Sequence, residues 1–300
     1  MSAQSKRAQV AYAVERGRSM RRACALLGVA RSTLTYGSRV AARNAPVVTR
    51  LRAISTAHPR WGYRRAWAVL RREHGAAVTG GGSGPINQKR VHRLWRAERL
   101  SLPTRRPRKK RPTGERVTPT ADRPNAVWTY DFVHDMCANG QTLKCLTVVD
   151  EHTKECLRIE VDGRLHSGRV IAVLGELVAA YGAPSHLRSD NGPEFVAHTV
   201  RRWLTATGIA TAYIEPGKPW QNGIGERFNG SLRDECLDRE WFHTRREARV
   251  VIEAYRRHYN EERPHSSLGY RTPAELGASR ARPTAAGTKE LDLNPRMVVS

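Results

Sequence analysis

The sequence predicts an α/β domain with a mixed five-stranded sheet and flanking helices, preceded by all-α segments. Two observations predict this fold class. Helical periodicity dominates the first hundred residues, whereas β-rich runs that later alternate with helical patterns follow residue 125. The charge also divides there: residues 1–120 carry 28 Lys and Arg against 4 Asp and Glu, and residues 121–300 carry 24 of each. Three hundred residues with 39% hydrophobic side chains suffice for two or more folded units.

The excess positive charge in the first two-fifths of the chain predicts a polyanionic partner that is held through its phosphates. An arginine-rich genome would raise the charge of both halves alike. The five cysteines form no C-x-x-C pair, and no apolar run of about 18 residues or signal-peptide core is present. We therefore expect a cytoplasmic protein with no membrane partner.

We assign residues 1–43 to a helix-turn-helix-like segment. Ser19 is suited to cap a helix through Leu27, Gly28 to form a turn, and Arg31 to begin a second helix. A generic helical hairpin is the alternative, and the surrounding charge favours DNA binding. The residues that such a segment would present to a DNA groove are Arg31, Ser32 and Thr33.

A second helical DNA-binding domain is expected at residues 44–101, with a Gly-rich loop near Gly81 that looks inserted. A helix that begins at Asn87 would turn apolar side chains inward and one cationic face outward. This face fits contacts to a DNA backbone, and because solvated faces usually mix charges of both signs, that alternative is weaker. Its cations are Lys89, Arg90, Arg93 and Arg96.

The remaining boundaries follow from composition. Residues 102–124 are basic and Pro-rich and predict an extended linker, residues 125–279 form an α/β core with a C-terminal helix, and residues 280–300 form a flexible tail. Closely spaced β-rich runs in the core predict an antiparallel meander, after which helices and strands alternate. The expected strands are 127–133, 143–149, 155–161, 186–189 and 209–214, and the expected helices are 169–181, 194–207, one from about Trp220, and 245–260.

The helix from about Trp220 carries two different faces. Ile224, Phe228 and Leu232 form an apolar stripe, as in any amphipathic helix. A second, polar face recurs at steps of four, three and four residues, and such a face suggests a functional site. Its members are Asn222, Glu226, Asn229 and Arg233.

Three acidic residues could converge at one edge of the sheet. Asp131 lies inside the first strand, where a buried carboxylate is costly unless a cation or a donor compensates it. Asp190 ends the fourth strand at the carboxyl edge, the usual location of ligand sites in open sheets. With Glu226 on the helix after the fifth strand, 58 and then 35 residues separate the three acids.

On these residues the chain resembles an insertion-sequence transposase, namely the catalytic reading-frame (OrfB-type) protein with a retroviral-integrase-like core. The resemblance covers nearly the whole chain, and the spacing of 35 residues together with the flanking motifs makes it specific. The motifs are Asn125-Ala-Val-Trp-Thr-Tyr-Asp-Phe-Val, Ser189-Asp-Asn-Gly-Pro-Glu-Phe, Pro216-Gly-Lys-Pro-Trp-Gln-Asn-Gly, Phe228-Asn-Gly-Ser-Leu-Arg-Asp-Glu-Cys-Leu and Tyr259-Asn-Glu-Glu-Arg-Pro-His-Ser-Ser-Leu-Gly-Tyr-Arg-Thr-Pro.

This resemblance implies a ribonuclease-H-like fold and the catalytic triad Asp131, Asp190 and Glu226. Grouped carboxylates favour two divalent ions, Mg²⁺ or Mn²⁺, about 4 Å apart in each active site. Gly225 departs from the family pattern. Since Gly in a helix costs up to ~1 kcal/mol, we expect the helix to start later than Trp220 or to stay flexible before metal and DNA bind. The expected DNA contacts here, some of which could instead support the site, are Lys218, Gln221, Asn222, Asn229 and Arg233.

The hypothesis is therefore a DNA transposase that cleaves and joins strands at the ends of an insertion sequence. The alternatives are a nuclease on the same core that does not join strands, and a non-catalytic DNA-binding regulator. The expected partners are terminal inverted repeats and target DNA, further copies of the chain on that DNA, and an upstream-frame protein or fusion. The expected location is the bacterial nucleoid.

Overall fold

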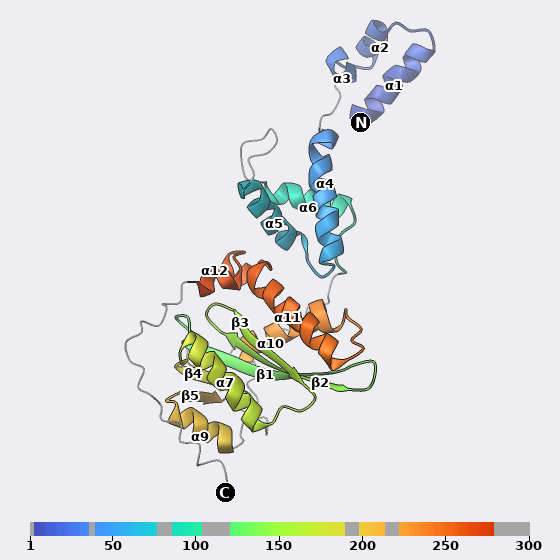
Figure 1. Ribbon diagram of the computed structural model, residues 1–300. Helices are drawn as coiled ribbons and strands as arrows, with labels where there is room; N and C mark the ends of the chain where they lie inside the picture. The colour runs from blue at the N-terminus through green and yellow to red at the C-terminus, as the bar shows by residue number, and fades with distance from the viewer. Residues whose placement is uncertain are drawn as a thin grey trace. The chain divides into compact units, whose positions relative to one another are not determined.

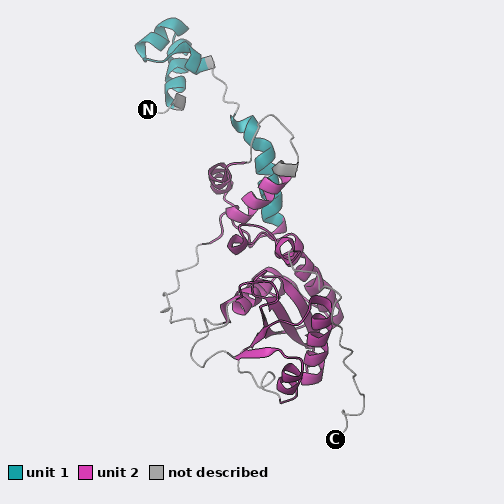
Figure 2. Ribbon diagram, turned by 90° about the vertical axis from the view of Figure 1, so that its left-hand side faces the viewer, with its two compact units in different colours: residues 1–56 teal, residues 57–300 magenta. Residues whose placement is uncertain are grey.

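The computed structural model describes residues 3–35, 40–76, 86–103, 121–189, 198–213 and 222–278. The chain divides into two compact units, residues 1–56 and 57–300 (Figure 2). Several predictions lie outside the described residues: most of the linker, the tail, the loop near Gly81, and the starts of two helices. Among the described helices, none has both the length and the apolar character needed to cross a bilayer.

The first unit begins with a small helical bundle whose buried residues are Val10, Ala23, Cys24 and Val29. The predicted cap and turn are confirmed. Ser19 accepts a hydrogen bond from the Arg22 backbone at 3.3 Å, and Gly28 adopts a φ of 58° that favours glycine. The helices that begin in this unit are α1 (Ala3–Glu15), α2 (Met20–Leu26), α3 (Arg31–Thr35) and α4 (Val40–Ala57).

The second unit starts with α5 (Tyr63–Ala76) and α6 (Gln88–Ala97). Asn87, where this helix is expected to begin, caps α6 by accepting a hydrogen bond from the Lys89 backbone at 2.8 Å. The indole of Trp67 on α5 donates to the carbonyl of Ile86 at 2.8 Å and so joins α5 to the start of α6. The apolar residues expected on the inner face of α6 are buried: Val91, Leu94 and Trp95.

The core of the second unit is a five-stranded sheet in the order β3-β2-β1-β4-β5 (Figure 1). The first three strands are antiparallel neighbours, whereas β4 pairs in parallel with both β1 and β5. The predicted mixed sheet is therefore confirmed. The strands are β1 (Val127–Met136), β2 (Thr142–Asp150), β3 (Cys156–Asp162), β4 (His186–Ser189) and β5 (Ala210–Tyr213).

Helices cover both faces of the sheet (Figure 1). Trp128 and Tyr130 of β1 pack on one face with the first pair of helices, whereas Val133 packs on the other face with the later ones. This alternation along β1 turns Thr129 and Asp131 toward the second face. The first pair is α7 (Ser167–Tyr181) and α9 (His198–Ala206), and the later elements are α10 (Gly223–Leu232), η2 (Arg233–Leu237) and α11 (Arg245–Glu261).

The strand β1 extends three residues beyond its predicted end. It stays paired with β2 as far as Met136, which lies opposite Thr142, and the hairpin closes through the hydrogen bond from Cys137 to Gln141. The polar residues at this end hid the strand from sequence reasoning, because strand pairing rather than apolar alternation maintains it. After α11, the chain ends its described part with η3 (Ser266–Leu268) and α12 (Pro273–Gly277).

Gly225 leads us to expect that the helix after β5 starts later than Trp220 or stays flexible before metal and DNA bind. α10 starts at Gly223, and Gly225 is buried inside it. A Cβ atom at Gly225 would lie 2.8 Å from Oδ1 of Asn222 and 3.0 Å from Oγ1 of Thr129. Glycine is therefore required because α10 approaches β1 closely at this point. A single turn of π-helix, η2, continues α10 without a break and was not predicted.

We predict that Gly225→Ala destabilises the protein by about 1–3 kcal/mol, because the added methyl group has no room between α10 and β1. Gly230→Ala is the matched control on the same helix, since a Cβ there meets nothing within 4 Å. This control should be neutral or stabilising by up to ~1 kcal/mol. Urea unfolding measures both changes. Equal effects of the two substitutions would contradict the close approach.

A second prediction concerns His265, whose ring lies 3.3 Å from the carbonyl of Tyr259. Burial and the charge of Arg263 lower the pKa of His265 from 6.5 to about 3. The unfolded chain therefore binds one more proton than the folded chain between these two pH values, and stability falls as the pH falls through this window. In His265→Asn, the free energy of unfolding should depend less steeply on pH, by up to about 1.4 kcal/mol per pH unit. Unfolding between pH 4.5 and 7 tests this, with the exposed His243→Asn as the control.

Candidate active site

Asp131 is the centre of a hydrogen-bond network between β1, β2 and α10. Its Oδ1 accepts from the backbone of Phe132 at 2.7 Å, and its Oδ2 accepts from the amide nitrogen of Asn229 at 2.8 Å. Thr147 lies directly opposite Asp131 on β2. Its hydroxyl is 3.0 Å from Oδ1 of Asn229 and 3.2 Å from the Asp131 carbonyl. This hydroxyl therefore orients the amide of Asn229 so that its nitrogen faces Asp131.

The predicted polar face of α10 lies along β1. Thr129 donates to Asn222 at 2.7 Å, Asn229 donates to Asp131, and Arg233 donates to the carbonyl of His134 at 3.0 Å. These contacts follow both segments in the same direction. Glu226 belongs to the same stripe, between Asn222 and Asn229, and is exposed. It lies about 4.5 Å along the helix axis from Asn229, the residue that holds Asp131.

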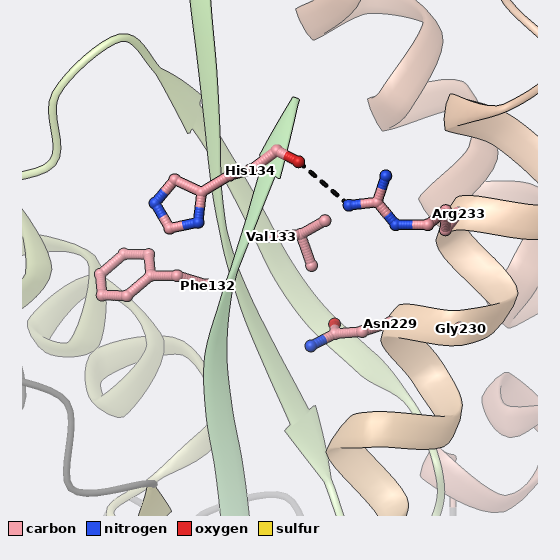
Figure 3. A pocket seen from close by; sticks show the side chains of 6 residues that line it. All are labelled: Phe132, Val133, His134, Asn229, Gly230 and Arg233. Carbon is pink, nitrogen blue, oxygen red and sulfur yellow. Dashed lines mark hydrogen bonds between the residues drawn. The ribbon is translucent and has the colours of Figure 1, made fainter. Parts of the chain in front are cut away.

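Beside this network lies an open cavity of about 380 Å³ (Figure 3). Its cation is Arg233, whose guanidinium reaches toward β1 and stays 45% exposed. Because the cavity combines a cation with the neighbourhood of Asp131, it can accept an anionic group next to that carboxylate. Its lining residues are Phe132, Val133, His134, Asn229, Gly230 and Arg233.

The structure distinguishes among the other predicted residues of this region. Asp190, Lys218 and Gln221 lie outside the described residues. The prediction of a DNA contact at Asn222 is wrong, because its side chain is buried, with 4% of the residue exposed, and is bonded to Thr129. It supports the approach of α10 to β1 instead. Asn229 is half-buried, and both ends of its amide are bonded within the core.

The residues predicted to meet DNA in the helical segments differ in exposure. On α3, Arg31 and Ser32 are exposed and Thr33 is half-buried. On α6, three of the four cations are exposed and Arg90 is half-buried. Their contacts with DNA stay a prediction. The exposed cations of α6 are Lys89, Arg93 and Arg96.

Sequence reasoning missed a buried ion pair on the same face of the sheet. Arg188 of β4 lies opposite Thr129, and its Nη1 is 2.9 Å from both carboxylate oxygens of Glu151. Burial raises the pKa of Glu151, and the charge of Arg188 opposes that shift. The pair fixes the end of β4, two residues before Asp190. An arginine inside a four-residue strand was the signal that could have revealed it.

Carboxylate oxygens such as those of Asp131 and Glu226 are donors that suit Mg²⁺ or Mn²⁺ better than zinc. Within the described ranges, no group of three His, Cys, Asp or Glu side chains is close enough to hold a metal ion. The third predicted acid, Asp190, is outside those ranges. The described residues therefore supply two of the three predicted metal ligands.

The integrase core domain family matches the chain over residues 121–219, and a second integrase core domain family matches residues 207–273. An HTH-like domain matches residues 42–108. These matches cover the sheet, α10 and α11, and the helices α5 and α6. The elements that surround Asp131 thus fall within the integrase core.

Two relatives extend the similarity over most of the chain. The uncharacterized 31.7 kDa protein of insertion element IS407 from Burkholderia multivorans is 40% identical over 267 residues, which are 89% of this chain and 93% of that protein. The transposase InsD of insertion element IS2 from Escherichia coli is 32% identical over 246 residues, covering 78% of this chain and 79% of that protein. The chain belongs to the family of insertion-element transposases with an integrase core, which are polynucleotidyl transferases.

Solved structures with a similar fold include retroviral integrase core domains. The HTLV-2 integrase catalytic core domain in complex with magnesium has a TM-score of 0.40 and 19% identity, covering 53% of this chain and 99% of that chain. The catalytic core domain of BIV integrase has a TM-score of 0.40 and 22% identity, covering 51% of this chain and 94% of that chain.

We predict that Asn229→Leu lowers the rate of DNA strand cleavage about 10- to 100-fold, because the Asp131 carboxylate loses the donor that orients it. The measurement is a single-turnover cleavage assay on DNA from the end of the element, with thermal unfolding as a check of the fold. Asn139→Ala is the control, since Asn139 is exposed in the turn between β1 and β2. A cleavage rate in Asn229→Leu equal to that of the control would exclude a positioning role.

Proposed function

We propose that the protein is a DNA transposase that cleaves strands at the ends of an insertion element and joins them to target DNA, with Asp131, Asp190 and Glu226 as its catalytic acids. The observation that carries this proposal is the bond between Asp131 and Asn229. It ties the acid in the central strand to the helical stripe that also bears Glu226, in a chain of the transposase family.

Charge and exposure support DNA as the substrate. The first 120 residues carry the entire net charge of +24. Exposed cations of α6 form one face of the HTH-like domain, and such a face contacts phosphates in many DNA-binding proteins. Arg233 presents a further guanidinium beside the cavity next to Asp131. These groups would bind a phosphate backbone at two separate places of the chain.

The carboxylates of Asp131, Asp190 and Glu226 would hold two divalent ions, Mg²⁺ or Mn²⁺. When bound, such ions stabilise the charges of the attacking and leaving oxygens in phosphoryl transfer. The donor set fits this role, since it consists of carboxylate oxygens, which Mg²⁺ and Mn²⁺ prefer.

The side chains around Asp131 have separate tasks in this proposal. Thr147 fixes the orientation of the Asn229 amide, and Asn229 fixes the Asp131 carboxylate. Arg233 binds a phosphate of the DNA next to the bond that is cleaved. The nucleophile is water in the cleavage step and a DNA 3′-hydroxyl in the joining step. No Ser or Tyr of the chain needs to form a covalent bond with DNA.

Joining two element ends to a target requires both ends in one complex, so we propose that copies of the chain assemble on DNA. The upstream-frame partner or fusion and the nucleoid location stay predictions. A nuclease that does not join strands and a regulator that only binds DNA are distinguished from the transposase by the products of the reaction.

The test uses labelled terminal inverted-repeat DNA with Mg²⁺ or Mn²⁺. We expect joined products from the wild-type protein and a loss of about 10³-fold or more in Asp131→Asn, Asp190→Asn and Glu226→Gln. Asp135→Asn is the matched control, because Asp135 lies four residues further along β1 and accepts a hydrogen bond from the backbone of Met136.

Each outcome identifies one function. Joined products that depend on the three acids support the transposase, and nicked products alone identify a nuclease. Binding without any product identifies a regulator. Metal-dependent activity that persists in all three variants would show that these acids are not the catalytic ones.

A further inference from the structure

The motif at residues 259–273, which we call the C-terminal motif, has no role in the catalysis described above. It begins at the end of α11. Asn260 bonds both backbone groups of Cys156 on β3, at 2.9 and 2.8 Å. The ring of Tyr259 packs edge-on against Phe228 of α10, with centroids 4.8 Å apart. The motif therefore fastens α11 to the sheet and to the helix that bears Glu226.

Arg263 of this motif forms a buried ion pair with Glu235, which lies in η2 directly after α10. Its Nε and Nη2 donate to the two carboxylate oxygens of Glu235 at 2.8 and 2.7 Å. Nη2 also reaches Ser231 of α10 at 3.3 Å. The side chains of Glu235 and Arg263 are only 10% and 5% exposed. One arginine thus holds both the last turn of α10 and the π-helical turn that follows it.

A second arginine, from the HTH-like domain, shares the same carboxylate. Nη1 of Arg65 on α5 lies 3.2 Å from Oε1 of Glu235. Burial raises the pKa of Glu235, but the hydrogen bonds and charge of Arg263 and the charge of Arg65 outweigh burial and lower it overall. Glu235 therefore stays ionised between the two cations. We call these three residues the Arg65–Glu235–Arg263 network.

Two further contacts join the same helical region to the core. Just before α5, His58 stacks against both Trp61 and His258 of α11, with ring centroids 3.8 and 4.9 Å from its own. Farther along α5, Arg72 donates to the carbonyl of Tyr270 at 2.9 Å. The helix α5 therefore meets the core at both of its ends as well as at Glu235. A displacement of α5 would therefore be transmitted to η2 through residues in direct contact.

We propose that the Arg65–Glu235–Arg263 network couples DNA binding by the HTH-like domain to the position of α10, and hence to the rate of catalysis. Arg65 and Glu235 are positioning residues in this proposal, which rests on the proposed function. DNA that engages α5 and α6 would favour the arrangement in which Arg65 bonds Glu235. Since η2 continues α10, that arrangement fixes the helix that carries Asn229 and Glu226.

The test separates coupling from simple packing with two DNA duplexes. One is the full terminal inverted repeat, and the other keeps only its last turn, about 10 base pairs, which can occupy the core but not the HTH-like domain as well. Arg65→Met removes the link from α5 and leaves the Glu235–Arg263 pair intact, so that the core can fold. Arg65→Lys retains the charge and should restore the link in part.

Arg169→Met is the matched control. Glu160 is also held by two arginines, Arg158 at 3.0 Å and Arg169 at 2.7 Å. Glu160 and Arg158 lie in β3 and Arg169 lies in α7, so that none of the three belongs to α10 or η2. Loss of Arg169 leaves the pair of Glu160 and Arg158, just as loss of Arg65 leaves the pair of Glu235 and Arg263. The two substitutions remove the same charge and the same number of partners from a shared carboxylate.

We expect the wild type and Arg169→Met to cleave the full duplex about tenfold faster than the short one, within the range common for coupled sites, and Arg65→Lys to give a ratio between this value and that of Arg65→Met. In Arg65→Met the two rates should converge at the lower value, with affinity for the full duplex changed less than about twofold. If Arg65→Met lowers the cleavage rates of both duplexes by the same factor, or lowers neither rate, the network only packs the core and the proposal is overturned.

Amide hydrogen exchange gives a readout that needs no catalysis. In the wild type, the full duplex should slow exchange in α10 more than the short duplex does. In Arg65→Met, the two duplexes should slow this exchange equally. If neither duplex is cleaved by any of the proteins, the proposed function fails while these exchange rates still decide the coupling. Equal protection of α10 by both duplexes in the wild type would overturn the coupling.

Discussion

The close approach of α10 to β1 is the contact on which the candidate site depends. Gly225 permits it by having no side chain, and three polar contacts then follow the two segments, from Thr129 through Asp131 to His134. A wider separation would remove the Asn229 donor from Oδ2 of Asp131. The polar face of α10 that bears Glu226 therefore lies near Asp131 because Gly225, which takes no part in the proposed chemistry, has no side chain.

Buried charges fix the surroundings of this contact. The pair of Arg188 and Glu151 holds the end of β4, and the pair of Arg263 and Glu235 holds the end of α10. Removing two charges from water is costly, and such pairs often stabilise a fold less than apolar residues would. Their geometry is directional, however, because both arginines reach two carboxylate oxygens. These pairs therefore fix the positions of the ends of β4 and α10 more precisely than apolar packing alone would.

The mixed sheet, its helices and the places of Asp131 in a strand and Glu226 on a helix could be predicted from the sequence, because alternation and helical spacing are local properties. The motifs also identified the family. The role of Gly225 could not be predicted, since a local penalty for glycine says nothing of a neighbouring strand that leaves no room for a side chain. Asn222 was misassigned for a related reason: a polar residue on a helix face was expected to be exposed, but tertiary packing buries it against Thr129.

The π-helical turn η2 changes the direction in which the chain presents its side chains. A π-helical turn holds more residues than an α-helical turn, so that side chains within η2 point in other directions than a continued α-helix would give them. Arg233 at its start still reaches β1, whereas Glu235 reaches α5 and Arg263. The turn thus lets one continuous helix direct Arg233 toward β1 and Glu235 toward α5.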